Sequence, residues 1–213
     1  MTRTLVHGVR RWLAVATALA LMGCASLFVS TPPGNLYRLT ANTSYPTALA
    51  PVRAQLLVDL PVAPAGIDTN RIALSKSPIS LDYYADAVWT DQVPALVEGA
   101  LLASFENSRA ITAIDRESTG LRADFVLTTE IRHFEAVYNA AQAAPEVRVT
   151  IAARLVAMPQ REIIAQSSFE QRVRAAANDV PAVVTAFDAA TDRVLGDIVV
   201  WTLTNPALSR ARR

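Results

Sequence analysis

The most constraining feature of this 213-residue sequence is a two-residue alternation of side-chain type between residues 146 and 173. One set of positions, largely apolar, comprises Val147, Val149, Ile151, Ala153 and Leu155, and then Ile163, Ala165, Ser167, Phe169 and Val173. Successive side chains of a strand point to opposite faces, so this period predicts two strands, each with one buried face. The short connection Met158–Arg161 makes an antiparallel pair the natural arrangement.

Two other stretches have the period of a helix. Between Thr90 and Ser108, apolar residues recur every three or four positions, with Thr90 as the expected N-cap and Pro94 in the first turn. A longer stripe runs from Val180 to Trp201, preceded by the capping pair Asn178-Asp179 and ended by Asn205-Pro206. Both stripes are interpreted as core-facing sides of amphipathic helices.

Shorter apolar runs complete the expected fold. Strands are predicted at 36–40, 54–61, 71–75, 79–84 and 111–115, and the long segment 123–138 alternates irregularly, which suggests a β-bulge. The sequence therefore predicts a single α+β domain. We expect an antiparallel sheet of about six to seven strands with two main amphipathic helices packed on one face.

The first residues have the pattern of a secretory signal peptide. Three arginines and no acid precede an uncharged apolar run over residues 12–21, which is about half of the ~20 residues that span a bilayer as a helix. Gly23 and Cys24 follow. The sequence Leu21-Met22-Gly23-Cys24 resembles the lipobox of bacterial lipoproteins, although Ala or Ser is commoner at the position of Met22.

The lipobox resemblance implies cleavage between Gly23 and Cys24 and a covalent diacylglycerol and N-acyl lipid on Cys24. Cys24 is the only cysteine of the chain, so no disulfide partner exists within it. The alternative is an ordinary buried cysteine, because free cysteine is usually buried. Ala25 follows the cysteine, and the absence of Asp there favours the periplasmic face of the outer membrane as the location.

The predicted organisation has four parts: a signal peptide (1–23), the lipidated cysteine and a tether (24–35), one domain (36–205) and a basic tail (206–213). Without the three arginines of residues 1–23, 17 basic and 19 acidic residues remain. This balance of about −2 gives no basic field for nucleic acid, and we expect no nucleic-acid partner.

Residue types that carry catalysis are scarce. His133 is the only histidine after residue 23, and it is interpreted as a structural residue beside Phe134. With Cys24 lipidated, no metal site, Cys–His pair or Ser–His–Asp triad is expected. The chain has seven glycines and no glycine-rich phosphate loop. We expect no cofactor and no enzymatic activity, although a catalytic pair of carboxylates is not excluded by sequence.

One stretch carries a family resemblance. Residues Leu57-Val58-Asp59-Leu60-Pro61 lead to Ile79-Ser80-Leu81-Asp82-Tyr83-Tyr84, and Trp89 and Pro94 follow. With the lipobox and Tyr37-Arg38-Leu39, this order of residues resembles the ABC-type transport auxiliary lipoproteins, the group that includes paraquat-inducible protein C. The resemblance covers most of the chain after the signal peptide and is strongest over residues 36–115.

The resemblance implies a non-catalytic accessory or docking subunit. Such lipoproteins accompany an ABC permease, its ATPase and a mammalian-cell-entry-type (MCE) protein, which together move lipids between the inner and outer membranes. Two alternatives stay open: a periplasmic lipid carrier, and a structural lipoprotein that links the outer membrane to the cell wall. A homo-oligomer is also compatible with the resemblance.

Tyr83, Tyr84 and Trp89 have two interpretations. Rigid aromatic side chains are enriched at protein interfaces, so these three residues are a predicted partner interface. Alternatively, they seal the junction between the sheet and the first helix.

Overall fold

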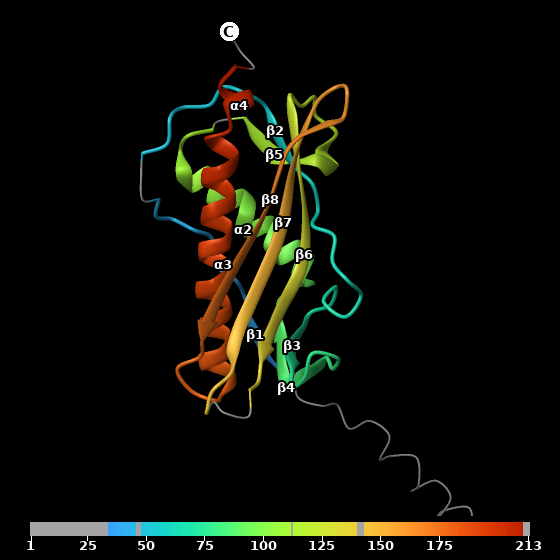
Figure 1. Ribbon diagram of the computed structural model, residues 1–213, viewed down its shortest axis with the longest axis vertical. Helices are drawn as coiled ribbons and strands as arrows, with labels where there is room; N and C mark the ends of the chain where they lie inside the picture. Colours follow the sequence, from blue (N-terminus) through green and yellow to red (C-terminus); the bar gives the residue numbers. More distant parts are fainter. Residues whose placement is uncertain (1–33, 46–47, 112, 140–142, 211–213) are drawn as a thin grey trace, which may run out of the picture. The chain divides into compact units, whose positions relative to one another are not determined.

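The computed structural model describes residues 34–210, except 46–47, 112 and 140–142. Three long strands form its centre (Figure 1): β6 (Phe125–Val137), β7 (Glu146–Ala157) and β8 (Glu162–Arg174). They pair antiparallel over nearly their whole length, with Ile151 opposite both Ile131 and Phe169. The predicted bulge in the long segment is confirmed, because the register shifts between Ile131 and His133.

Five shorter strands extend this centre to a sheet of eight strands. They are β1 (Asn35–Tyr37), β2 (Leu56–Val58), β3 (Arg71–Ser75), β4 (Asp82–Trp89) and β5 (Ile114–Arg116). Because β6 is long, two strands share its second edge: β2 pairs with its beginning and β3 with its end. The strand order is β1-β4-β3-β6-β2-β5, and β7 and β8 continue from the other edge of β6.

The predicted α+β class and the two main helices are confirmed, but the sheet differs from the expectation in strand number and direction. It is mixed: the pairs β1–β4, β2–β5, β2–β6 and β3–β6 are parallel. Each of these pairs is joined through a long connection, and only such a connection allows parallel pairing. Local alternation reports which residues are buried and carries no information on strand direction.

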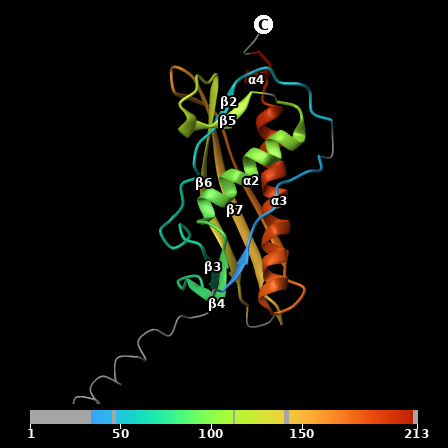
Figure 2. The same cartoon turned by 180° about the vertical axis from the view of Figure 1, so that it is seen from behind.

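The main helices are α2 (Val93–Ser108) and α3 (Val180–Leu203), and both cover the same face of the sheet (Figure 2). Asp179 caps α3 as predicted, by accepting a hydrogen bond from the Ala182 amide at 2.9 Å. The predicted cap of α2 was wrong, because the N-cap is Gln92 and its side chain makes no capping bond. None of the described helices is long and apolar enough to cross a membrane.

Part of the predicted basic tail is structured. Residues Pro206–Arg210 form the short helix α4, and Leu208 is buried in the core. Asn205 begins this helix by accepting a hydrogen bond from the Ala207 amide at 3.0 Å. The Asn-Pro pair therefore ends one helix and starts another, because proline fits the first turn of a helix.

Candidate functional site

The aromatic motif lies where β4 leads into α2, and Trp89 is its most buried member. Trp89 is 0% exposed, and its ring centroid lies 5.9 Å from that of Phe134 and 5.5 Å from that of Phe187, in edge-to-face contacts. Phe134 comes from β6 and Phe187 from α3. Trp89 therefore seals the sheet–helix junction, as the second interpretation states, and its buried ring is not accessible to a partner.

The two tyrosines of the motif are half-buried and bonded within the domain. The Tyr83 hydroxyl donates to the Gly66 carbonyl at 3.0 Å, and the Arg71 guanidinium lies 3.8 Å from the centre of its ring. The Tyr84 and Tyr138 hydroxyl oxygens are 2.9 Å apart. Burial, and then the bond to Tyr138, raise the pKa of Tyr84. Contact of these two tyrosines with a partner stays a prediction.

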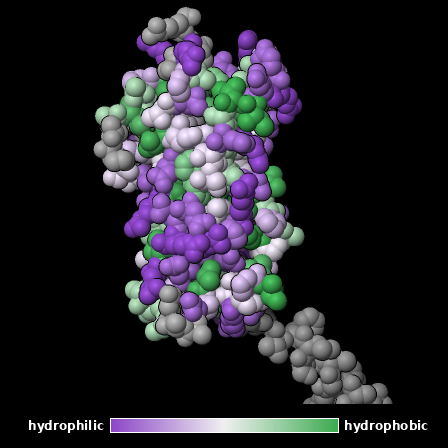
Figure 3. Space-filling model, viewed as in Figure 1, coloured by the Kyte–Doolittle hydropathy of each residue, from purple (hydrophilic) through white to green (hydrophobic). Residues whose placement is uncertain are grey.

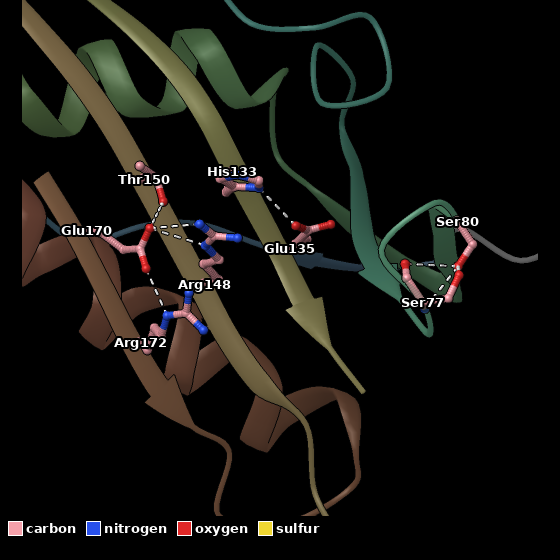
Figure 4. Close-up of polar contacts among 8 residues, drawn as sticks. All are labelled: Ser77, Ser80, His133, Glu135, Arg148, Thr150, Glu170 and Arg172. Atoms are coloured by element: carbon pink, nitrogen blue, oxygen red, sulfur yellow. Dashed lines mark hydrogen bonds and ion pairs between the residues drawn. The ribbon is translucent and has the colours of Figure 1, made fainter. Parts of the chain in front are cut away.

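The face of β6–β8 opposite the helices carries a charged network (Figure 4), and hydrophilic residues cover much of the middle of this face (Figure 3). Arg148 and Arg172 lie directly opposite each other on β7 and β8. Without a counter-charge, such a like-charged pair would destabilise the sheet. Glu170 offsets this repulsion: its carboxylate accepts hydrogen bonds from Arg172 Nε at 2.8 Å and Arg148 Nη2 at 2.9 Å. The Thr150 hydroxyl donates to it as well, at 2.9 Å.

This network predicts a pH dependence of stability. The hydrogen bond from Arg172, followed by those from Arg148 and Thr150, lowers the pKa of Glu170 to about 2. A lowered pKa in the folded state adds stability above the ordinary carboxyl range, and that stability is lost as the pH falls toward 2. We expect the free energy of unfolding of Glu170→Gln to fall less steeply than that of the wild type below pH 4.5. Urea unfolding at several pH values measures this slope.

The matched control for this prediction is Glu162→Gln, which removes an exposed carboxylate from the other end of β8. This variant is expected to retain the wild-type pH profile. Identical slopes for Glu170→Gln and the wild type would show that the ion pairs contribute nothing to folding.

His133 lies on the same face, not in the core. Its Nδ1 is 3.1 Å from the Glu135 carboxylate. A hollow of about 430 Å³ separates this pair from the β3–β4 hairpin, where the Ser77 and Ser80 hydroxyl oxygens lie 2.9 Å apart. The histidine and the serines therefore belong to two separate hydrogen-bonded pairs (Figure 4). Among the described residues, no cluster of three or more His, Cys, Asp or Glu could hold a metal ion.

The upper end of this face is apolar, which the sequence analysis missed. Val126, Val156 and Ile163 are aligned across β6, β7 and β8, and Met158 and Leu121 adjoin them in two shallow hollows of about 280 and 430 Å³. We call these five residues the distal patch, and a hydrophobic cluster is visible near this end in Figure 3. Glu117, Arg161 and Asp59 lie around it in the same hollows. An apolar centre with a charged rim is the usual composition of a protein interface.

Ile163 belongs to the distal patch because of a β-bulge. We predicted it on the buried face, but the register shifts between Leu155 and Val156, and Ile163 is 55% exposed. The extra residue is Ile164, which packs against the core instead. The adjacent pair of isoleucines, which interrupts the alternation, was the sequence signal for this reversal.

A groove of about 550 Å³ lies on the other side, between β8 and α3. Its apolar wall includes Phe169 and Trp201, whose ring centroids are 5.8 Å apart, and Tyr45, whose hydroxyl donates to the Ser104 carbonyl. Burial, with a smaller effect of the Asp192 carboxylate, raises the pKa of Tyr45 to about 12. This groove is open and is lined by both polar and aromatic side chains.

The connection between β1 and β2 crosses the two helices at Asn42. The side-chain amide of Asn42 donates a hydrogen bond to the Asp192 carbonyl of α3 at 3.2 Å. The backbone amide of Asn42 donates to the Ser104 hydroxyl of α2 at 2.9 Å. Gly196 makes this crossing possible, because a Cβ atom there would lie 2.8 Å from Asn42 Nδ2. The predicted lipidation site Cys24 and the cleavage position Gly23 lie outside the described residues.

Similar proteins support a common family. Protein XCC0632 from Xanthomonas campestris, a DUF330 protein with a crystal structure, is 30% identical over 79% of this chain and 94% of its own, with a TM-score of 0.75. A crystal structure of an uncharacterized protein shares the fold at 14% identity over 77% of this chain and 95% of its own, with a TM-score of 0.61. The uncharacterized protein bll6063 of Bradyrhizobium diazoefficiens is 29% identical over 78% of this chain, which spans 45% of that relative.

A family model that matches most of the domain shows the family to which the chain belongs. The model of the ABC-type transport auxiliary lipoprotein component matches residues 37–199, from β1 nearly to the end of α3. It includes the aromatic motif, the charged network and the distal patch. The chain therefore belongs to the family of ABC-type transport auxiliary lipoproteins.

Proposed function

We propose that this protein is a lipid-anchored, non-catalytic docking subunit of an MCE-type ABC system that moves lipids between the inner and outer membranes. The family match over residues 37–199 carries this proposal, because the family is an auxiliary component of ABC-type transport. The lipobox at Gly23 and Cys24 supplies the anchor, and Ala25 favours the outer membrane. The partners are the ABC permease with its ATPase, and the MCE-domain protein.

The distal patch is the surface that we assign to the partner. It lies at the start of β6, whereas the chain enters the domain at β1, which pairs with β4 at the other end of the sheet. Leu121 and Ile163 are both more than half exposed. Contiguous exposed apolar residues with a polar rim mark interaction sites in soluble domains. A tethered subunit would present this patch away from its anchor.

The proposal is tested by affinity capture of the tagged full-length protein from detergent-solubilised membranes. We expect the wild type to retain the MCE-domain protein, the permease and the ATPase. The double variant Leu121→Asp/Ile163→Asp places two charges in the patch and is expected to reduce capture at least tenfold, because a buried unpaired charge is costly. The matched control is Leu36→Asp, at an exposed apolar position on the edge strand β1.

Two outcomes would contradict the proposal. Absence of all three transport proteins from the wild-type capture would remove the accessory role. Undiminished capture by the double variant, at an unchanged melting temperature, would show that the partner binds another surface.

One observation favours the lipid carrier as a second candidate. The groove beside Phe169 and Trp201 has about 550 Å³ and an apolar wall, which is large enough for part of an acyl chain. Mass spectrometry of non-covalent lipids extracted from the purified full-length protein tests this candidate. A stoichiometric lipid that is lost in Trp201→Asp supports it, and a lipid-free protein rejects it.

A further inference from the structure

The connection between β3 and β4 exposes an isoleucine completely. Ile79 is 98% exposed, the highest value among the large apolar residues that the structure describes. The turn that presents it is held by the Ser77 amide, which donates to the Ser80 hydroxyl at 3.1 Å, and by the Ser80 amide, which donates to the Ser77 carbonyl at 3.2 Å. The isoleucine is thus fixed at the apex of a short, internally bonded hairpin.

This hairpin points to the end of the sheet at which the chain enters. Strand β4 starts at the hairpin, and β1 runs parallel to it, with Asn35 opposite Ala87. The N-terminal end of β1, at Asn35, therefore faces the same end of the sheet as the hairpin. Ten residues lie between Cys24 and Asn35, and the eleven steps from one Cα atom to the other span at most about 40 Å in an extended chain. A lipid on Cys24 would keep this end close to a bilayer.

The connections at this end are nearly free of charge. Because β6 and β3 run parallel and end together, Tyr138 lies beside the start of the hairpin, and its amide donates to the Ser75 carbonyl at 2.8 Å. The Ala175 amide donates to the Pro145 carbonyl at 3.0 Å. Across residues 76–81, 138–145 and 175–179, the sequence has only Lys76 and Asp179 as charged residues. The segment 109–124, between α2 and β6, carries six charged residues at the distal end: Arg109, Asp115, Arg116, Glu117, Arg122 and Asp124.

We infer that the β3–β4 hairpin rests on the phospholipid bilayer to which the chain is anchored, with the Ile79 side chain in the interfacial region. The inference depends on the lipid anchor of the proposed function, because a single isoleucine binds a membrane weakly by itself. The anchor supplies the missing affinity as a high effective concentration of bilayer at the hairpin. The contact would fix the orientation of the domain and hold the distal patch roughly 40 Å from the surface, the length of a 12-residue strand.

The test uses the full-length lipoprotein reconstituted in vesicles of phosphatidylethanolamine and phosphatidylglycerol. Ile79→Cys carries an environment-sensitive fluorophore, and Leu121→Cys, in the distal patch, is the matched control. Lipidation blocks the thiol of Cys24, so each variant has one free thiol. We expect doxyl-labelled lipid to quench the fluorophore at position 79 at least twofold and to leave the fluorophore at position 121 unchanged.

The outcomes separate this inference from the proposed function. Protein that floats with the vesicles, but whose position 79 is quenched by aqueous iodide and not by doxyl lipid, overturns the inference and leaves the anchor intact. Shielding from both quenchers also overturns it, since a protein partner or a second copy then covers the hairpin. Failure of the protein to float with the vesicles overturns both the anchor and the inference.

Discussion

Trp89→Ala is expected to lower the free energy of unfolding by about 3–5 kcal/mol, the usual cost of truncating a large buried aromatic side chain. The indole connects three elements, because it contacts Phe134 of β6 and Phe187 of α3 from the end of β4. Its removal would leave a cavity at the centre of the core that the fixed strands cannot close. Chemical denaturation of the full-length protein in detergent measures the shift of the midpoint.

Two further variants test the reason for this loss. Trp89→Phe is expected to cost much less, because the buried indole Nε1 has no hydrogen-bond partner among the described residues and a phenyl ring keeps most of the apolar contact. Trp201→Ala, at a half-buried position beside Phe169, is the control for loss of a tryptophan outside the core centre. A stable Trp89→Ala protein that no longer captures its partners would instead support the interface interpretation.

Arg116→Ala is expected to lower the free energy of unfolding by about 1.5–3 kcal/mol, the range for hydrogen bonds to charged groups. Glu98 of α2 is 8% exposed, and Arg116 Nε of β5 lies 3.0 Å from its carboxylate. Removal of the arginine leaves a buried carboxylate without its counter-charge, and an uncompensated buried charge is the costly part of such a change. Thermal unfolding at neutral pH measures the loss.

The matched test of this pair is the double variant Glu98→Gln/Arg116→Ala. Because a neutral amide costs less to bury than a carboxylate, the double variant is expected to be more stable than Arg116→Ala alone. A double variant that is less stable than Arg116→Ala would contradict the claim that the unpaired Glu98 carboxylate destabilises the folded protein.

Residue periodicity was sufficient to predict the centre of the fold. The alternation at Val147–Leu155 is reproduced by the buried positions of β7, and the stripe from Val180 to Trp201 lies within α3. Both signals arise from burial of one side of a regular element, which a single sequence records directly. The α+β class followed from these elements.

Strand direction and local register were not predictable in the same way. The parallel pairing of β2 and β3 with β6 depends on the path of long connections, and no residue pattern within a three- or five-residue strand reports it. The shift that exposes Ile163 depends on a single extra residue, Ile164, in β8. The helix at Pro206–Arg210 is short, and its burial of Leu208 results from tertiary packing.

The candidate sites illustrate the same limit. The sequence singled out Trp89 as an unusual aromatic residue, but exposure decides between a core and an interface role, and exposure is a property of the whole fold. The distal patch combines residues from β6, β7, β8, the connection before β6 and the connection between β7 and β8. Its first and last members, Leu121 and Ile163, are 42 positions apart. Only the folded sheet brings these side chains together.

The central claim is that this protein acts while held at a membrane by a lipid on Cys24. The most direct measurement is metabolic labelling of expressing bacteria with a clickable fatty acid, followed by the intact mass of the purified protein. The account predicts a labelled chain that begins at Cys24 and carries the mass of a diacylglycerol and an N-acyl group, and an unlabelled Cys24→Ser variant. An unlabelled wild-type protein, or one that retains Met1, would contradict it.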